Sequence, residues 1–204
     1  MLGIGVTSLK EIMYTREENI AALEAGLGRP VAKRMACEID AAEFDMVEGS
    51  MRDGRAHDVT MFIRKKSDPS RIAVIRKPFF PPDVFRAPSG AANRGESLEQ
   101  GAIRESKEET GLDVELIRYV AKINARFTSA DRAIDWISHV FEASELSGAL
   151  KPIDTREIAE ARWASLEEIQ GPIRKALLDT GWGLFRYRVA LTDLTARALE
   201  EVEA

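Results

Sequence analysis

The spacing of hydrophobic residues predicts helices at both ends of the chain. Near the start, apolar residues recur at roughly helical spacing, namely Ile12, Met13, Ile20 and Leu23. Ser8 followed by Glu11 has the form of a capping box, so we expect a helix over residues 9–26. Residues 184–203 predict a closing helix.

Another helix is expected ahead of the closing one. Ser165 and Glu168 form a second capping box, which predicts a helix running to about Thr180. Gly171-Pro172 lies inside this stretch, and proline removes a backbone donor, so we expect a shift or kink there.

The middle of the chain contains segments whose composition is typical of β-strands. HDVTMFIRK (57–65) and RIAVIRK (71–77) are rich in β-branched and apolar residues, and the SDPS between them is turn chemistry, which together predict a hairpin. Further strands are expected at 84–87, 114–127 and 136–141. The stretch 36–50 is ambiguous, with a strand expected around 43–47.

This order of strands and helices predicts an α/β (α+β) fold, a curved mixed β-sheet with helices on both faces. A length of 204 residues allows one well-buried domain with helical additions. We therefore expect a helical extension over residues 1–35 and a catalytic domain over 36–204.

Composition and charge limit the kinds of partner and the cellular compartment that we expect. The formal charge of −5 gives no basic footprint for a nucleic acid, so no nucleic-acid partner is expected. Cys37 is the only cysteine, which fits a reducing compartment. We find neither a signal peptide nor an apolar run of about 18 residues, and we expect a cytoplasmic protein without a membrane span.

The most informative stretch is GAANRGESLEQGAIRESKEETGL, residues 90–112. Ser97 is placed to cap a helix and Gly111 to end it. At 100° per residue, three glutamates of this helix fall within an arc of about 100°, namely Glu105, Glu108 and Glu109. Like charges at this spacing repel and destabilise a helix. A hard cation such as Mg²⁺ or Mn²⁺ bound between the glutamates would make their cluster stabilising. Gly101 would leave room beside the cluster.

The same stretch resembles the signature of the Nudix hydrolases. Gly90 is followed after five residues by Glu96 and after seven more by Arg104-Glu105-Ser106-Lys107-Glu108-Glu109-Thr110-Gly111-Leu112. Ser106 is the one departure, since the family usually has a larger apolar residue there. Ser106 faces away from the carboxylate arc, so we expect the change to weaken helix packing and to leave the chemistry intact.

The resemblance implies metal-dependent hydrolysis of a nucleoside diphosphate linked to another group. By similarity, Glu105 and Glu109 bind Mg²⁺ or Mn²⁺, and Glu108 is a ligand or the base that activates water. The Gly90 carbonyl completes the shell. Arg104, beside the catalytic carboxylates, and Glu96 orient them, as outer-shell partners do at metal sites.

Residues outside the signature are candidates on weaker grounds. Many family members place a further acid in a later loop, and REIAEARW (156–163) offers Glu157 and Glu160. We favour Glu157 as the base or an extra metal ligand; the alternative for either residue is a solvated loop carboxylate. Arg86 is a candidate phosphate ligand. Phe127 is a candidate for stacking on a base, although aromatic residues on strands more often belong to the core.

Two questions stay open at this stage. The marks that distinguish ADP-ribose, dinucleoside polyphosphate, NADH and coenzyme A cleavers are not visible, so the sequence does not choose a nucleotide-like substrate. The alternative function is a non-catalytic sensor that binds a nucleotide or ADP-ribose. We also expect a homodimer that uses the helix over 9–26, although that helix has the alternative of packing on its own domain.

Overall fold

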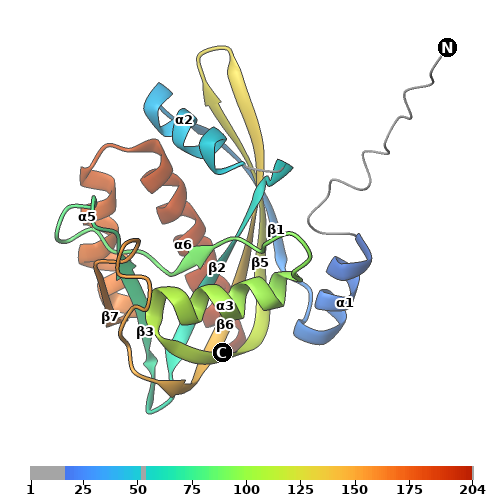
Figure 1. Cartoon of the computed structure of the whole chain (residues 1–204), viewed down its shortest axis with the longest axis vertical. Coiled ribbons are helices and arrows are strands. Elements are labelled where there is room, and N and C mark those ends of the chain that lie inside the picture. Colours follow the sequence, from blue (N-terminus) through green and yellow to red (C-terminus); the bar gives the residue numbers. More distant parts are fainter. Residues whose placement is uncertain (1–16, 52–53, 204) are drawn as a thin grey trace.

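The computed structural model describes residues 17–51 and 54–203, which form one mixed β-sheet between helices (Figure 1). The sheet has seven strands in the order β1-β5-β6-β2-β3-β7, with β4 paired to β2. The strands are β1 (Val31–Glu38), β2 (His57–Lys65), β3 (Asp68–Arg76), β4 (Ser89–Gly90), β5 (Leu112–Ser129), β6 (Arg132–Gly148) and β7 (Glu160–Ser165). The pairs β1–β5 and β2–β6 are parallel and the others are antiparallel.

The helices lie before, between and after these strands. They are α1 (Glu17–Leu27), α2 (Ala41–Ser50), α3 (Leu98–Thr110), α4 (Leu166–Glu168), α5 (Arg174–Asp179) and α6 (Gly183–Glu203). A π-helical turn, η3 (Ile169–Ile173), joins α4 to α5 and contains Pro172. The predicted distortion of this helix at Gly171-Pro172 is therefore confirmed.

The central strands bury side chains on both faces. On β2, Val59, Met61 and Ile63 belong to one core cluster, whereas Phe62 belongs to the other. This alternation follows from the two-residue period of a strand. Because β2 is covered on both faces, it is a nearly continuous apolar run.

Different helices cover the two faces (Figure 1). Leu23 of α1 and Leu98 of α3 pack in the cluster with Val59, and α2, α5 and α6 contribute to the cluster with Phe62. The predicted mixed sheet with helices on both faces is confirmed. The long pair β5–β6 also confirms the strands expected at 114–127 and 136–141, with both strands longer than expected.

The strand expected around 43–47 is wrong, because this segment lies in α2. Asp40 caps the helix: its carboxylate accepts from the Glu43 amide at 2.8 Å, and the Glu43 side chain accepts from the Asp40 amide at 3.1 Å. Phe44 and Val47, three residues apart, then reach the core together. The capping box and the helical spacing of these two apolar residues explain why the segment forms a helix.

Two other segments differ from expectation. The stretch 84–87 forms only an isolated bridge between Arg86 and Ile75. Residues Val31–Glu38, which the pattern did not assign, form the edge strand β1 parallel to β5. This strand crosses position 35, where we placed the boundary between the extension and the catalytic domain.

The described part of the N-terminal helix packs on its own domain. Leu23 is only 1% exposed, and Ile20 and Leu27 pack against the same cluster. Ile12 and Met13 lie outside the described residues. This is the alternative that competed with a partner contact, and the homodimer stays a prediction. Among residues 17–51 and 54–203, we find no helix with the length and apolar character that crossing a membrane requires.

Candidate active site

Helix α3 is fixed at both ends by its sequence. The Ser97 hydroxyl accepts from the Gln100 amide at 3.2 Å and the Gln100 side chain accepts from the Ser97 amide at 2.9 Å. Gly111 ends the helix at φ +78°, in the left-handed region that glycine adopts at low cost. These caps set the rotation of the helix and thereby the direction of its glutamates.

The loop before α3 lies directly against the helix. A Cβ on Gly90 would stand 1.9 Å from the carboxylate carbon of Glu105, and a Cβ on Gly101 would stand 2.6 Å from Cα of Ala92. Both glycines are therefore needed for close approach. The room that we expected at Gly101 is occupied by the loop backbone.

Ser106 is fully buried on the sheet side of α3. Its hydroxyl donates to the Ala102 carbonyl at 2.7 Å, so this buried donor has a partner. The departure from the family signature thus lies away from the carboxylates, as expected.

Arg104 connects three acidic side chains. Its Nε and Nη2 donate to the two oxygens of Glu96 at 2.9 and 3.0 Å, and its Nη1 donates to Glu105 and Glu108, both at 2.9 Å. Nη2 also donates to the Ala91 carbonyl at 2.6 Å. The guanidinium therefore joins the loop to the helix, and the orienting role expected for Arg104 and Glu96 stays a prediction.

Glu109 is the most buried of the three glutamates. Its carboxylate accepts from the Ser89 amide at 2.7 Å, and Nη2 of Arg86 lies 3.8 Å away. Burial raises the pKa of Glu109 to about 7, against the lowering influence of Arg86 and Lys77. Arg86 also donates to the Ser89 hydroxyl at 2.7 Å, which fixes its guanidinium beside Glu109.

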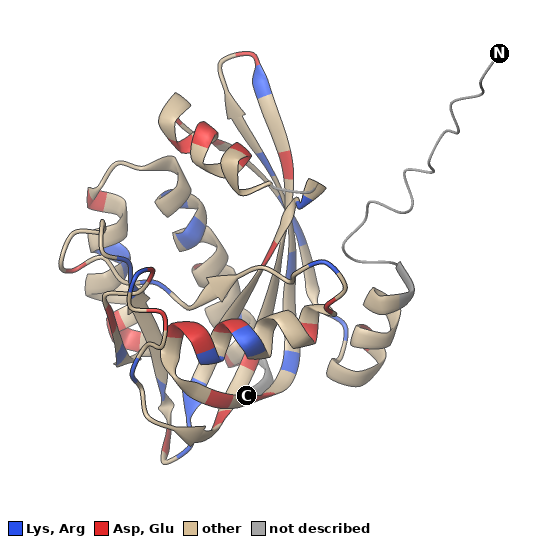
Figure 2. Cartoon of the chain, viewed as in Figure 1, with Lys and Arg blue, Asp and Glu red and all other residues tan. Residues whose placement is uncertain are grey.

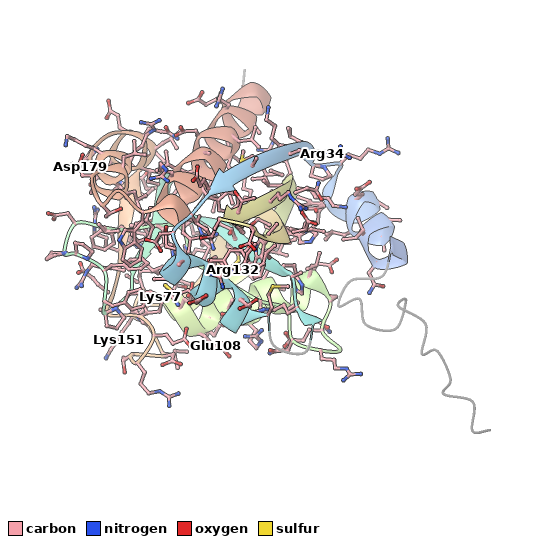
Figure 3. All side chains as sticks on the ribbon, turned by 90° about the horizontal axis from the view of Figure 1, so that it is seen from above. Arg34, Lys77, Glu108, Arg132, Lys151 and Asp179 are labelled. Atoms are coloured by element: carbon pink, nitrogen blue, oxygen red, sulfur yellow. The ribbon has the colours of Figure 1, made fainter. Side chains whose placement is uncertain are left out.

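A cavity of about 450 Å³ brings most of the candidate residues together. Those that line it are Gly90, Glu105, Glu108, Glu109, Arg86, Phe127 and Glu157. Figure 2 shows acidic residues gathered toward the C-terminal end of α3, and Figure 3 shows Glu108 and Lys77, another lining residue, on the same side of the molecule.

Glu157, Glu160 and Phe127 differ in how exposed their side chains are and in which residues they contact. Glu157 is 65% exposed and its carboxylate lies 3.4 Å from Nζ of Lys77. Glu160 instead accepts from Nη2 of Arg76 at 3.2 Å and is not among the cavity lining residues. Phe127 is 2% exposed and packs edge to face with Tyr187, so the core offers little of its ring to a ligand.

A buried polar group that the sequence reasoning missed also lines the cavity. Nη2 of Arg188, on α6, donates to the Asp58 carboxylate at 2.7 Å, and Trp136 donates its indole N–H to Asp58 at 3.1 Å. Burial raises the pKa of Asp58, but Arg188, Ser138 and Trp136 outweigh it and hold the pKa below its usual value. Arg188 lies one helical turn after Leu184, at the spacing of the apolar face of α6. A charged residue at such a position was the feature of the sequence that could have indicated a buried ion pair.

The donor set fits a divalent cation. Three carboxylates and the Gly90 backbone lie around one cavity, and hard cations prefer oxygen ligands. In the part of the chain described, no three Asp, Glu, His or Cys side chains are already arranged as ligands of one ion. Arg104 and the Ser89 amide hold the three glutamates instead.

Comparison with known proteins agrees with this geometry. A family model described as the NUDIX domain matches residues 54–181. The NAD-capped RNA hydrolase NudC of Pseudomonas aeruginosa is 31% identical over 113 residues, 53% of this chain and 38% of that protein. The NAD(P)H pyrophosphatase NUDT13, mitochondrial, of Mus musculus is 31% identical over 110 residues, 53% of this chain and 30% of that protein. The chain thus spans less than two thirds of the length of these relatives.

A solved structure shows the same fold. The MutT protein from Methanosarcina mazei superposes with a TM-score of 0.51 at 21% identity, covering 74% of this chain and 96% of that one. The family match covers more than half of the chain and contains every glutamate of α3. The chain therefore belongs to the Nudix family.

Proposed function

We propose that the protein is a divalent-metal-dependent hydrolase that cleaves the diphosphate linkage of a nucleotide-derived substrate. The observation that carries this proposal is the single cavity shared by Glu105, Glu108 and Glu109 with Gly90 and Arg86. When bound, a divalent cation neutralises diphosphate charge and lowers the pKa of a water molecule.

The chain's own residues have separable roles in this proposal. Glu105, Glu109 and Glu108, with the Gly90 carbonyl, would hold Mg²⁺ or Mn²⁺. Arg104 and Glu96 keep the carboxylates oriented through the hydrogen bonds described above. Arg86 and Lys77 place positive charge beside Glu109, where it would offset the negative charge of a phosphate.

The printed names of two relatives suggest the first substrates to test. NudC is named for NAD-capped RNA and NUDT13 for NAD(P)H. We therefore place NADH first in a panel of nucleoside diphosphate derivatives that also contains ADP-ribose. The expected absence of a nucleic-acid partner stays a prediction, because the name of NudC includes RNA. The cytoplasmic location and the homodimer also stay predictions.

The deciding experiment is hydrolysis of this panel with Mg²⁺ or Mn²⁺, by wild type and Glu109→Gln. Removing one charged ligand should lower the rate by a factor of about 10³ or more, and EDTA should abolish turnover. Glu99→Gln is the matched control, because Glu99 lies on the same helix and is not a lining residue of the cavity. Full activity of a folded Glu109→Gln protein, or of wild type in EDTA, would refute the proposal. Binding of the panel without turnover would favour the sensor.

A further inference from the structure

Part of the cavity wall is built by segments outside the Nudix match. Helix α2 contributes Met46, Val47 and Ser50, and the segment that begins α6 contributes Trp182, Leu184, Phe185, Tyr187 and Arg188. These segments precede residue 54 or follow residue 181. They add to this cavity a surface that the family signature does not supply.

Four rings form a continuous row along this wall. The centroids of Phe79 and Phe80 are 4.9 Å apart, those of Phe80 and Phe185 are 4.9 Å apart, and those of Phe185 and Trp182 are 5.1 Å apart. All four line the cavity, and we call this row the aromatic wall. Phe185 and Trp182 are nearly parallel, with an interplanar angle of 9°.

The two ends of the aromatic wall are open. Phe79 is 59% exposed and Trp182 is 36% exposed, whereas Phe80 and Phe185 are buried between them. Met46, from α2, is also exposed and lines the same cavity. Large apolar side chains gathered at a cavity that also holds carboxylates and arginines mark a binding surface.

The wall is held in place by hydrogen bonds around the start of α6. The Glu43 carboxylate, from α2, accepts from the amides of Gly183 and Leu184 at 3.1 and 2.8 Å. A Cβ on Gly183 would stand 2.6 Å from the Glu38 carbonyl oxygen, so α6 begins in close contact with the end of β1. The Trp182 amide donates to the Thr180 hydroxyl at 3.2 Å. Trp182 therefore projects from a fixed turn.

A planar ring attached to a phosphate is the ligand that suits both parts of the cavity. The volume of about 450 Å³ lies within the range of small-molecule sites. Aromatic faces bind nucleotide bases by stacking, with little dependence on which base is present. The cations Arg86 and Lys77 line the same cavity and would face the phosphate.

We propose that the aromatic wall, through the exposed faces of Trp182 and Phe79, binds the planar ring of the substrate. This inference rests on the proposed function, since it places the ring in the same cavity as the glutamates. It makes Trp182 a specificity-determining residue contributed from outside the Nudix match.

The test compares ligands that differ by the ring alone. AMP and nicotinamide mononucleotide carry a ring on a ribose phosphate, and ribose 5-phosphate lacks it; none contains a diphosphate linkage. Calorimetry on the full chain with Mg²⁺ should give tighter binding of at least one ringed ligand than of ribose 5-phosphate. Trp182→Ala should weaken that ligand about tenfold and leave ribose 5-phosphate unchanged, because stacking is lost and the phosphate contacts remain.

Two further variants separate stacking from a structural effect. Trp182→Phe should keep most of the affinity but show less quenching of tryptophan fluorescence by the ringed ligand than wild type, since Trp136 also lines the cavity. Ile117→Ala, at an exposed apolar residue of β5 that is not among the lining residues, should change nothing.

The inference is overturned if neither ringed ligand binds more tightly than ribose 5-phosphate, or if Trp182→Ala binds both classes as wild type does. If the protein hydrolyses the substrate panel but binds neither ringed ligand more tightly than ribose 5-phosphate, this inference is overturned and the proposed function stands. A ring preference lost in Trp182→Ala, without metal-dependent hydrolysis, supports the inference and counts against the proposed function.

Discussion

Glu157 and Glu160 lie three residues apart, yet the structure gives them different surroundings. Glu157 lines the cavity and lies near Lys77, whereas Glu160, the first residue of β7, pairs with Arg76 of β3. A base must come within hydrogen-bond reach of the water it activates, directly or through one water. Only Glu157 of this pair lines the space shared with the α3 glutamates.

We therefore predict that Glu157→Gln lowers kcat by about 10²-fold or more with little change in KM, since a general base acts mainly in the transition state. Steady-state kinetics with the best substrate of the panel measures this. Glu160→Gln is the control and should keep wild-type kinetics. Wild-type kcat across the pH range in Glu157→Gln would assign proton transfer to Glu108 or to metal-bound water alone.

At the scale of elements, one buried carboxylate joins two helices. Glu43 takes part in the capping box of α2 and also accepts from the first two amides of α6. The side chain is buried, so its loss leaves backbone donors without a partner. Each buried donor left unpaired costs about 1–3 kcal/mol.

Glu43→Ala should accordingly lower the free energy of unfolding by about 2–5 kcal/mol. Urea denaturation of the variant and wild type measures the difference. Glu48→Ala, at an exposed glutamate of the same helix, should change it by less than about 0.5 kcal/mol. Equal losses in the two variants would show that Glu43 contributes helix propensity and not the junction between helices.

The elements differ in how far the sequence alone could predict them. Helix α3 was predictable to the residue, because Ser97, Gln100 and Gly111 define its ends locally. The strand β1 was not, because its burial and pairing depend on β5, about 90 residues later. Helix α2 was not predicted, although Asp40 and Glu43 have the spacing of a capping box.

The candidate site divides in the same way. The signature in residues 90–112 located the glutamates, Gly90 and Arg104, because these contacts lie within one loop and helix. Asp58, Arg188 and Trp182 come from segments far apart in the chain. The packing of α6 against the sheet brings them to the same cavity. A motif of consecutive residues contains no information about such long-range packing.

At the scale of the whole molecule, pH should act on stability through a buried histidine of the central sheet. Burial lowers the pKa of His139 to about 3, and His57 and Lys122 act in the same direction. Oη of Tyr119 lies 2.6 Å from Nδ1 of His139. Which of the two groups donates in this hydrogen bond depends on the tautomer of His139; burial raises the pKa of Tyr119, so its hydroxyl stays protonated. The folded protein therefore holds His139 neutral.

The unfolded chain binds a proton at this histidine near pH 6.5, whereas the folded chain does not until about pH 3. The contribution of His139 to stability is thus complete above pH 6.5 and is lost as the pH falls toward 3, by up to about 1.4 kcal/mol per pH unit. Glu109 has the opposite sign, because its raised pKa means that the folded state binds a proton first between about pH 7 and 4.5. A pH profile of wild type alone would mix the two.

Comparison with His139→Gln removes this difficulty, since Glu109 is present in both proteins and cancels in the difference. We predict that wild type is the more stable protein at pH 7.5 and that its advantage shrinks by about 1 kcal/mol per pH unit below pH 6. Urea unfolding in EDTA at pH 7.5, 6 and 5 measures the gap without a contribution from metal binding. A gap that stays constant with pH would mean that His139 accepts a proton in the folded sheet as easily as in the unfolded chain, and the assignment of a neutral ring held by Tyr119 would then be wrong.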